Sequence, residues 1–188
     1  MKRITCFVAI IMALVCMNAN AQESLSYSKV IQQEGKSSSE IYKTVKKWFA
    51  KTFRSAQDVI QYDEAGEEIN GKAAIVYEEK NITWTAASGL VYYNIDVKVK
   101  DGRFKVNFDN FIHRSTHPRF SKEWSNGLVY GKDLTDEQLK MIGISGLAKK
   151  QYRAIEKRLK PLCFNEIASL VASLETFLDQ NKQEDDDW

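Results

Sequence analysis

Side chains that perform nucleophilic or acid–base catalysis are sparse in this sequence. It has only two histidines, His113 and His117. Residues four apart share a face of a helix, but this segment reads as a strand end followed by a loop with Pro118. There is no His-Glu-x-x-His, no Gly-x-Ser-x-Gly and no pair of cysteines with zinc-binding spacing. We therefore predict no catalytic residue, no metal site, no cofactor and no enzymatic activity.

Carboxylates leave one enzymatic alternative open. Two acidic side chains that hydrolyse a glycosidic bond are brought together by the fold, so their spacing in the sequence does not reveal them. A hydrolase of an envelope or glycan substrate thus stays as an alternative function.

Four cations surround a predicted hairpin turn at Asp101 and Gly102. In the expected register they face each other across the two strands, and like charges placed directly opposite destabilise a sheet. An anionic ligand would explain them, whereas solvent screening at an exposed tip is the structural alternative. These candidate ligand-binding residues are Lys98, Lys100, Arg103 and Lys105.

A second group of candidates lies in the long connection 115–132. Loops of this length are usually functional or disordered, and the aromatic content of this one argues against disorder. The segment either covers an open edge of the sheet or core, or forms a binding loop. Its candidate ligand-binding residues are Arg119, Trp124 and Tyr130.

The elements that would position these groups follow from the apolar pattern. Residues 26–33 form a first strand, and Ser37 with Glu40 has the spacing of a capping box at the start of a helix. Helical periodicity continues to Phe53. Two strands over 56–62 and 72–78 follow, and residues 84–87 open the next strand. Glycines at positions 66 and 71 are expected to form the turn between the two strands.

The alternation over residues 90–113 is the clearest hairpin signal. One register makes one face of this hairpin apolar and the other polar, and a slip by one residue would invert both faces. The predicted apolar pairs are Val99 with Phe104, Val97 with Val106, Ile95 with Phe108 and Val91 with Ile112. The predicted polar pairs are Lys98 with Lys105, Asp96 with Asn107 and Asn94 with Asp109.

The C-terminal third is predicted to be helical. Thr135 and Gln138 form a second capping box, and a long apolar helical pattern covers 148–180. Pro161 lies within it, so we expect a kink or a break near Lys160. Cys163 stands among apolar residues and is interpreted as a buried small hydrophobic side chain rather than a reactive thiol.

The N-terminus has the three parts of a secretory signal peptide. Lys2 and Arg3 precede an apolar run over 4–17, which is shorter than a membrane-spanning helix, and a small-x-small site ends at Ala21. Cleavage after Ala21 would export the protein to the periplasm, cell surface or extracellular space without a transmembrane segment. Cys16 follows Leu14 and Val15 rather than the small residues that lipidation requires, so a lipoprotein is not expected.

Removal of the leader changes the charge and the cysteine content. The whole chain has a formal net charge of +2, so loss of Lys2 and Arg3 leaves a neutral chain without the basic footprint of nucleic-acid binders. Cys163 would be its only cysteine, so stability must come from packing rather than a disulfide. The predicted organisation is a signal peptide (1–21), a sheet domain (22–134), C-terminal helices packed on it (135–182) and an acidic tail (183–188).

The order strand, helix, four strands, helix resembles the TATA-binding-protein-like α+β fold, an antiparallel sheet packed by helices, here with an extra C-terminal helical segment. Three local patterns, within residues 27–111, resemble an uncharacterised family of exported Bacteroidetes proteins, a domain of unknown function assigned that fold. They are the helix with Trp48 and Phe53; Asp63, Gly66, Ile69 and Gly71 around the first turn; and the hairpin segment 97–104. The resemblance implies the fold and no catalytic residues, and a fold name does not imply DNA binding.

Three functions remain at this point. The preferred one is an exported binding or interaction module for a small ligand or an envelope protein, with no nucleic-acid partner. The alternatives are the carboxylate hydrolase and a structural accessory subunit whose last helix docks on a partner.

Overall fold

The structure of the chain is a computed structural model. It describes the backbone of residues 23–186 and the side chains of residues 23–180. The predicted signal peptide, with Cys6 and Cys16, lies outside the described residues, as do residues 187–188 of the predicted acidic tail. The elements are β1 (Tyr27–Gln32), α2 (Ser38–Thr52), α3 (Ala56–Val59), β2 (Ile60–Glu64), β3 (Glu68–Tyr77), the 3-10 turn η1 (Thr85–Ala87), β4 (Gly89–Lys100), β5 (Arg103–Ser115), α4 (Ser121–Trp124), β6 (Gly127–Leu128), α5 (Asp136–Met141) and α6 (Gly146–Asp186).

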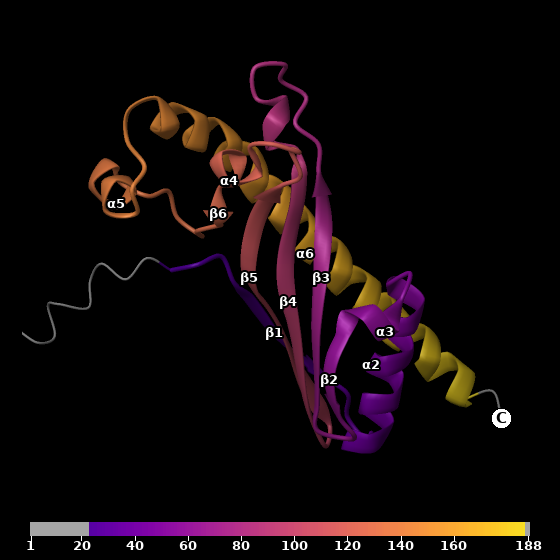
Figure 1. Cartoon of the computed structure of the whole chain (residues 1–188). Coiled ribbons are helices and arrows are strands. Elements are labelled where there is room, and N and C mark those ends of the chain that lie inside the picture. Colours follow the sequence, from indigo (N-terminus) through magenta and orange to yellow (C-terminus); the bar gives the residue numbers. More distant parts are fainter. Residues whose placement is uncertain (1–22, 187–188) are drawn as a thin grey trace, which may run out of the picture.

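The strands form one antiparallel sheet with helices on a single face. Its order is β1-β5-β4-β3-β2, and the short β6 pairs with β5 beyond the end of β1. Figure 1 shows the long α6 running along the sheet, with α2 beside it near one end. Alternate residues of β3 are buried and exposed, as expected when helices cover only one face. We call the covered side the helix face and the other side the open face. This two-layer α+β architecture confirms the predicted fold class.

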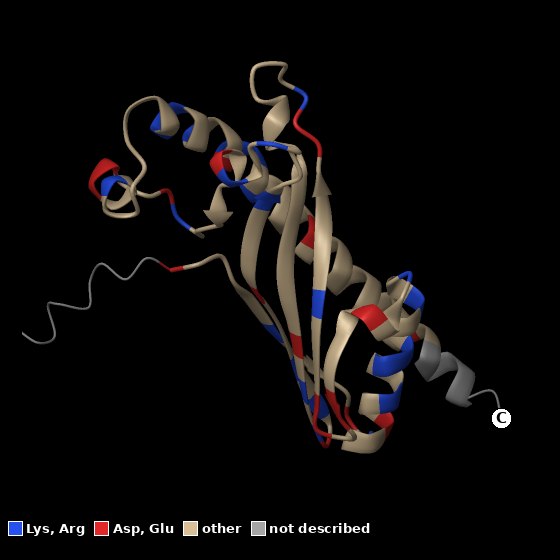
Figure 2. Cartoon of the chain, in the orientation of Figure 1, with Lys and Arg blue, Asp and Glu red and all other residues tan. Residues whose placement is uncertain are grey.

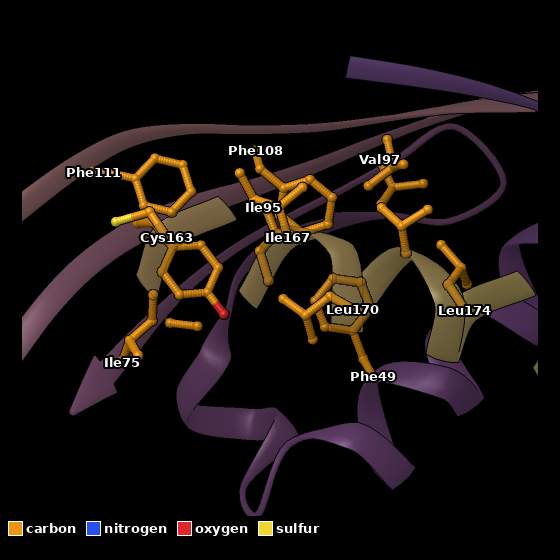
Figure 3. Close-up of a cluster of buried hydrophobic side chains, with 14 of the residues drawn as sticks. Phe49, Ile75, Ile95, Val97, Phe108, Phe111, Cys163, Ile167, Leu170 and Leu174 are labelled. Atoms are coloured by element: carbon orange, nitrogen blue, oxygen red, sulfur yellow. The ribbon is translucent and has the colours of Figure 1, made fainter. Parts of the chain in front are cut away.

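The core lies between the helix face and the two main helices. Cys163, Ile167, Leu170 and Leu174 project from α6 toward the apolar side chains of the central strands, and Phe49 of α2 completes the cluster (Figure 3). All of these side chains are buried. Burial raises the pKa of the Cys163 thiol to about 12, so it packs as a small hydrophobic group.

Helix α2 is fixed at its start and along its polar side. The Ser37 hydroxyl accepts from the Glu40 N–H, and the Glu40 carboxylate accepts from the Ser37 N–H at 2.8 Å, which confirms the predicted capping box. Further along, Tyr42 and Lys46 both donate to the carboxylate of Asp63 in β2. The edge strand is thereby tied to the helix through polar contacts.

The register of the β4–β5 hairpin agrees with the prediction near the turn and departs from it further away. Val97 lies opposite Val106, and Lys98 lies opposite Lys105. The predicted pairing of Val91 with Ile112 is wrong, because a bulge places Val91 opposite His113.

The bulge centres on Asn110, a non-glycine residue with a φ of 53°. The extra residue on β5 shifts the alternation, so Phe111 and His113 face the core while Ile112 turns to the open face.

Three local predictions between α2 and β4 are wrong. Residues 56–59 form the helical turn α3, so strand β2 begins only at Ile60. β3 begins at Glu68, so Gly71 lies inside this strand rather than in a turn. A glycine suits this position because a Cβ there would approach the Phe49 ring at 3.1 Å. Residues 85–87 form the turn η1, and β4 begins at Gly89, where a Cβ would lie 2.1 Å from the Arg114 carbonyl oxygen.

The C-terminal helices contain a second, smaller core. Thr135 and Gln138 make the predicted capping box of α5. Helix α6 continues without a break through Pro161, so the predicted break near Lys160 is not present. The second core consists of Leu134, Leu139 and Tyr152, with Tyr130 and Ile144 packed against it.

Candidate functional site

The turn between β4 and β5 is anchored to the loop that precedes α2. Gln33 N–H donates to the Gly102 carbonyl at 2.8 Å, and Gly102 N–H donates to the Lys36 carbonyl at 2.9 Å. The Asp101 carboxylate accepts from the Ser38 N–H at the N-terminus of α2, at 2.7 Å. Gly102 has a φ of +73°, which this tight turn requires. The hairpin tip is therefore a fixed platform rather than a free loop.

The four predicted cations stand together on the open face of this platform. Lys98 lies opposite Lys105, Lys100 lies opposite Arg103, and all four side chains are exposed. We call them the tip cations. With Val30 of β1 and Phe104 they line a hollow of about 300 Å³, which we call the cationic hollow.

Few carboxylates in the described part of the protein lie close enough to neutralise the tip cations. Lys98 Nζ lies 3.8 Å from a Glu68 carboxylate oxygen. Among the described residues, no carboxylate lies within 4.0 Å of Lys100, Arg103 or Lys105. The nearest turn residue, Asp101, is engaged by the helix.

A second hollow on the other side of β4 differs in charge. It has a volume of about 470 Å³, and its lining combines Lys98 and Lys100 with Glu67, Glu68 and Asp101. Figure 2 shows acidic and basic segments meeting near the turns at this end of the sheet. The lining on the β3 side thus has three carboxylates and two lysines, whereas every charged residue of the lining on the β1 side is a cation, which identifies the β1 side as the candidate anion site.

The three predicted loop residues lie elsewhere. β5 has 13 residues, so at about 3.3 Å per residue its two ends are about 40 Å apart. The tip cations are at one end, and the segment that carries Arg119, Trp124 and Tyr130 follows the other end. The structure does not bring the two groups of candidates into one site.

Each loop residue has its own environment. Arg119 is exposed, whereas Trp124 is half-buried with its ring 6.1 Å from that of Trp84. Tyr130 forms a β-bridge with Ser24 and packs against the second core. Within the same segment β6 pairs with β5, and Val129 N–H donates to Phe111 at 2.8 Å, so this stretch extends the sheet where β1 ends.

Both histidines serve the fold. His113 is fully buried; its Nδ1 accepts from the Asn126 N–H at 3.0 Å, so its Nε2 carries the proton and donates to the Ala87 carbonyl at 2.9 Å. Burial lowers the pKa of His113 to about 4. The Nδ1 of His117 accepts backbone N–H groups of Arg119 and Phe120. Neither imidazole faces a nucleophile among the contacts of the described residues.

The carboxylates of the open face are also engaged. Asp109 accepts from the amides of Asn94 and Asn107 at 3.2 and 2.6 Å. Burial, together with the charge of Asp109, raises the pKa of Asp96 above its ordinary value. Among the described residues no group of three or more His, Cys, Asp or Glu side chains could hold a metal ion.

The sequence did not reveal that Val30 belongs to the hollow. This valine comes from β1, more than sixty positions away in the chain, and lies opposite Lys105 with half of its surface exposed. Only the β1–β5 register could have predicted this contact, and the imperfect alternation of β1 does not define that register.

The comparison with known families agrees with this architecture. Residues 27–114 match the profile of a domain of unknown function (DUF4468) with TBP-like fold. This segment resembles the DUF4468 family. The segment contains β1 to β4, α2 and all of β5 except its last residue, so the resemblance noted in the sequence is confirmed. The tip cations lie within the matched segment, while Arg119, Trp124 and Tyr130 lie outside it.

Two solved structures are similar to the chain. One is a DUF4468 family protein from Bacteroides ovatus ATCC 8483, at 18% identity and a TM-score of 0.42, covering 77% of this chain and 87% of that one. The other is a TBP-like protein from Parabacteroides distasonis ATCC 8503, at 12% identity and a TM-score of 0.45, covering 85% and 97%. No curated protein matches the sequence. DUF4468 has no named function, so the function must be argued from the geometry.

Proposed function

We propose that this protein is a non-enzymatic binding module whose ligand is a polyanion held in the cationic hollow. The observation that carries the proposal is that the four charged residues lining this hollow, on a rigid hairpin tip, are all cations. The ligand class consists of molecules with closely spaced phosphate, sulfate or carboxylate groups, because the Lys98–Lys105 and Lys100–Arg103 pairs present four charges side by side.

The energetics of the sheet support a ligand. Like charges directly opposite each other in a sheet destabilise it by a few tenths of a kcal/mol to about 1 kcal/mol per pair. Two such pairs stand in adjacent positions here. A bound polyanion would offset this repulsion, so cations at these positions favour ligand binding at the expense of the stability of the free protein.

The exposed valine adds a second element of recognition. Val30 lines the cationic hollow and lies opposite Lys105 in the sheet. An anion attached to an apolar or sugar-ring surface would cover this side chain, whereas a free inorganic ion would not. We therefore expect polyanionic glycans or phosphorylated envelope molecules to bind more tightly than inorganic phosphate.

The proposal includes export. The signal-peptide pattern of residues 1–21 supports cleavage after Ala21 and a place in the periplasm, on the surface or outside the cell. Within residues 23–186, no helix has the length and apolar content to cross a bilayer.

The test is calorimetric titration with inorganic pyrophosphate and a heparin-derived hexasaccharide at low salt. The variant Arg103→Gln/Lys105→Gln removes two of the four tip cations and should bind the hexasaccharide at least tenfold more weakly. This corresponds to a loss of at least about 1.4 kcal/mol of binding free energy. The matched control is Lys43→Gln/Lys47→Gln, which removes two exposed cations from α2. It should bind like the wild type.

A second measurement separates binding from folding. Without ligand, the Arg103→Gln/Lys105→Gln variant should unfold at the same or a higher temperature than the wild type, because repulsion between opposed cations is relieved. Equal hexasaccharide affinity in the two double variants, or no binding of either anion by the wild type, would refute the proposal.

A further inference from the structure

The corner between α5 and α6, residues 141–147, carries large apolar side chains that the fold does not bury. Leu147 is 88% exposed, Met141 75% and Ile142 42%. Ile144, in the same segment, packs against the second core. The segment therefore divides into one anchoring side chain and three that point away from the protein.

This corner is an ordered feature. Gly143 N–H donates to the Lys140 carbonyl at 3.0 Å, and Ile144 N–H donates to the Leu139 carbonyl at 2.8 Å, which closes the end of α5. Gly143 and Gly146 adopt φ values of +83° and +54°, so the backbone reverses within a few residues. The exposed side chains are consequently held at a fixed edge.

The corner lies at the periphery of the molecule. Figure 1 shows α5 and the start of α6 projecting away from the sheet, at the end opposite the hairpin tip. The exposed side chains of this edge are unbranched or branched aliphatic groups, so it lacks the aromatic anchors that are enriched in protein interfaces. The fluid acyl region of a bilayer accommodates such aliphatic side chains more readily than a rigid protein surface does.

Charges of both signs border the corner. A hollow of about 320 Å³ beside it is lined by Asp136, Glu137, Lys140 and Lys149, together with Ile144, Ser145 and Gly146. Lys149 Nζ lies 2.8 Å from an Asp136 carboxylate oxygen. A phospholipid with an ammonium and a phosphate in its headgroup matches this lining, with the carboxylates facing the ammonium and the lysines facing the phosphate.

We propose that the α5–α6 corner docks on a zwitterionic phospholipid bilayer, inserting Met141, Ile142 and Leu147 below the headgroups while the mixed-charge hollow contacts the headgroups. Aliphatic side chains at the acyl boundary and lysine stems at the headgroup level are the usual arrangement of interfacial docking. The contact is peripheral, and because both signs of charge are present it depends little on ionic strength.

The test is flotation with vesicles of phosphatidylcholine and phosphatidylethanolamine, using protein that begins at Gln22. This protein contains every described residue and lacks the apolar run 4–17, which would itself bind lipid. The wild type should float with the vesicles in 0.1 M and 0.5 M NaCl. Met141→Ser/Leu147→Ser should lower the partition coefficient at least tenfold.

The matched control removes two apolar side chains of similar exposure that lie away from the α5–α6 corner. Val76 is 64% exposed on β3 and Ile82 is 88% exposed in the loop after it, so Val76→Ser/Ile82→Ser should float like the wild type. Arg103→Gln/Lys105→Gln should also float unchanged, because the cationic hollow takes no part in this contact.

Several results would overturn the inference. These are no flotation of the wild type, equal loss in both serine variants, or binding that needs anionic lipid and disappears in 0.5 M NaCl. Self-association of the wild type that Met141→Ser/Leu147→Ser abolishes, without flotation, would assign the corner to an interface between copies of the chain.

Discussion

His113 illustrates how a single residue couples the sheet to the segment that follows it. Its two ring nitrogens connect the carbonyl of Ala87 with the N–H of Asn126, and its ring packs edge-on against Tyr77 at 5.3 Å. The neutral imidazole satisfies both partners in the core. A second proton on Nδ1 would face a donor instead of an acceptor, so the folded state disfavours the charged form.

This arrangement predicts a pH-dependent stability. The pKa of His113 is lowered from 6.5 to about 4 in the folded chain, so the unfolded chain binds a proton first as the pH falls. Stability from this residue is complete above pH 6.5 and is lost as the pH falls toward 4. The slope approaches about 1.4 kcal/mol per pH unit only below pH 6.5, so the free energy of unfolding should fall by about 1.6 kcal/mol between pH 6.5 and 5.

Urea denaturation at pH 7, 6.5 and 5 measures this fall. The variant His113→Gln should be less stable at pH 7 but lose clearly less stability between pH 6.5 and 5. The control His117→Gln removes the other histidine, which lies outside the core, and should retain the fall. The same pH dependence in wild type and His113→Gln would contradict the assignment.

At the scale of elements, α6 is continuous although Pro161 lies inside it. A proline in a helix interior removes one backbone hydrogen bond and crowds the preceding turn, at a cost of about 3 kcal/mol. Buried residues on both sides of it, such as Leu159 and Cys163, keep their positions in the core. Tertiary packing therefore outweighs the local preference for a break.

Replacement of this proline should stabilise the protein. Pro161 is exposed, so Pro161→Ala creates no cavity and restores an N–H donor. We expect the free energy of unfolding to rise by about 1 to 3 kcal/mol. Ser169→Ala, at an exposed position of the same helix, should change it by only a few tenths. Thermal and urea denaturation measure both, and an unchanged or lower stability of Pro161→Ala would show that the helix needs the proline.

The elements that could be predicted from the sequence are those with a strong local signal. The capping box at Ser37 and the alternation through Val97 and Phe104 each fix an element, and burial decides the hairpin register. The bulge at Asn110 could not be predicted, because its positive φ depends on packing along β5. The sequence predicts a turn at Gly71 because the close approach of the Phe49 ring, which disfavours a Cβ there, is a tertiary contact that no local pattern reveals.

The candidate site likewise has some features that the local sequence predicts and others that depend on tertiary contacts. The tip cations follow from alternation and the turn alone, so their common face was predictable. Their separation from Arg119 and Trp124 follows from the length of β5, because the two groups lie at opposite ends of that strand. The partnership with Val30 depended on pairing between distant strands.

At the scale of the whole molecule, the two proposed surfaces lie at opposite ends. The cationic hollow belongs to the hairpin tip, and the α5–α6 corner lies beyond the other end of the sheet (Figure 1). Docking of the corner on a bilayer would direct the hollow away from the lipid. Anionic ligands would then be held at a distance from the membrane surface, so the two activities can be abolished separately.

The DUF4468 segment and the C-terminal helices form one folding unit, which leads to a prediction for the intact molecule. Ile155, Cys163, Leu170 and Leu174 are buried in the same core as the sheet, so a fragment 22–134 would expose the apolar helix face to water, and we expect it to lack a cooperative thermal transition and to bind the dye ANS. A matched fragment 22–180 keeps every described side chain and should unfold in one transition near that of 22–188. Calorimetry and near-ultraviolet circular dichroism measure both fragments. A cooperative transition of 22–134 at a similar temperature would mean that the sheet and α2 bury enough apolar surface by themselves, and that α6 is an independent addition to the fold.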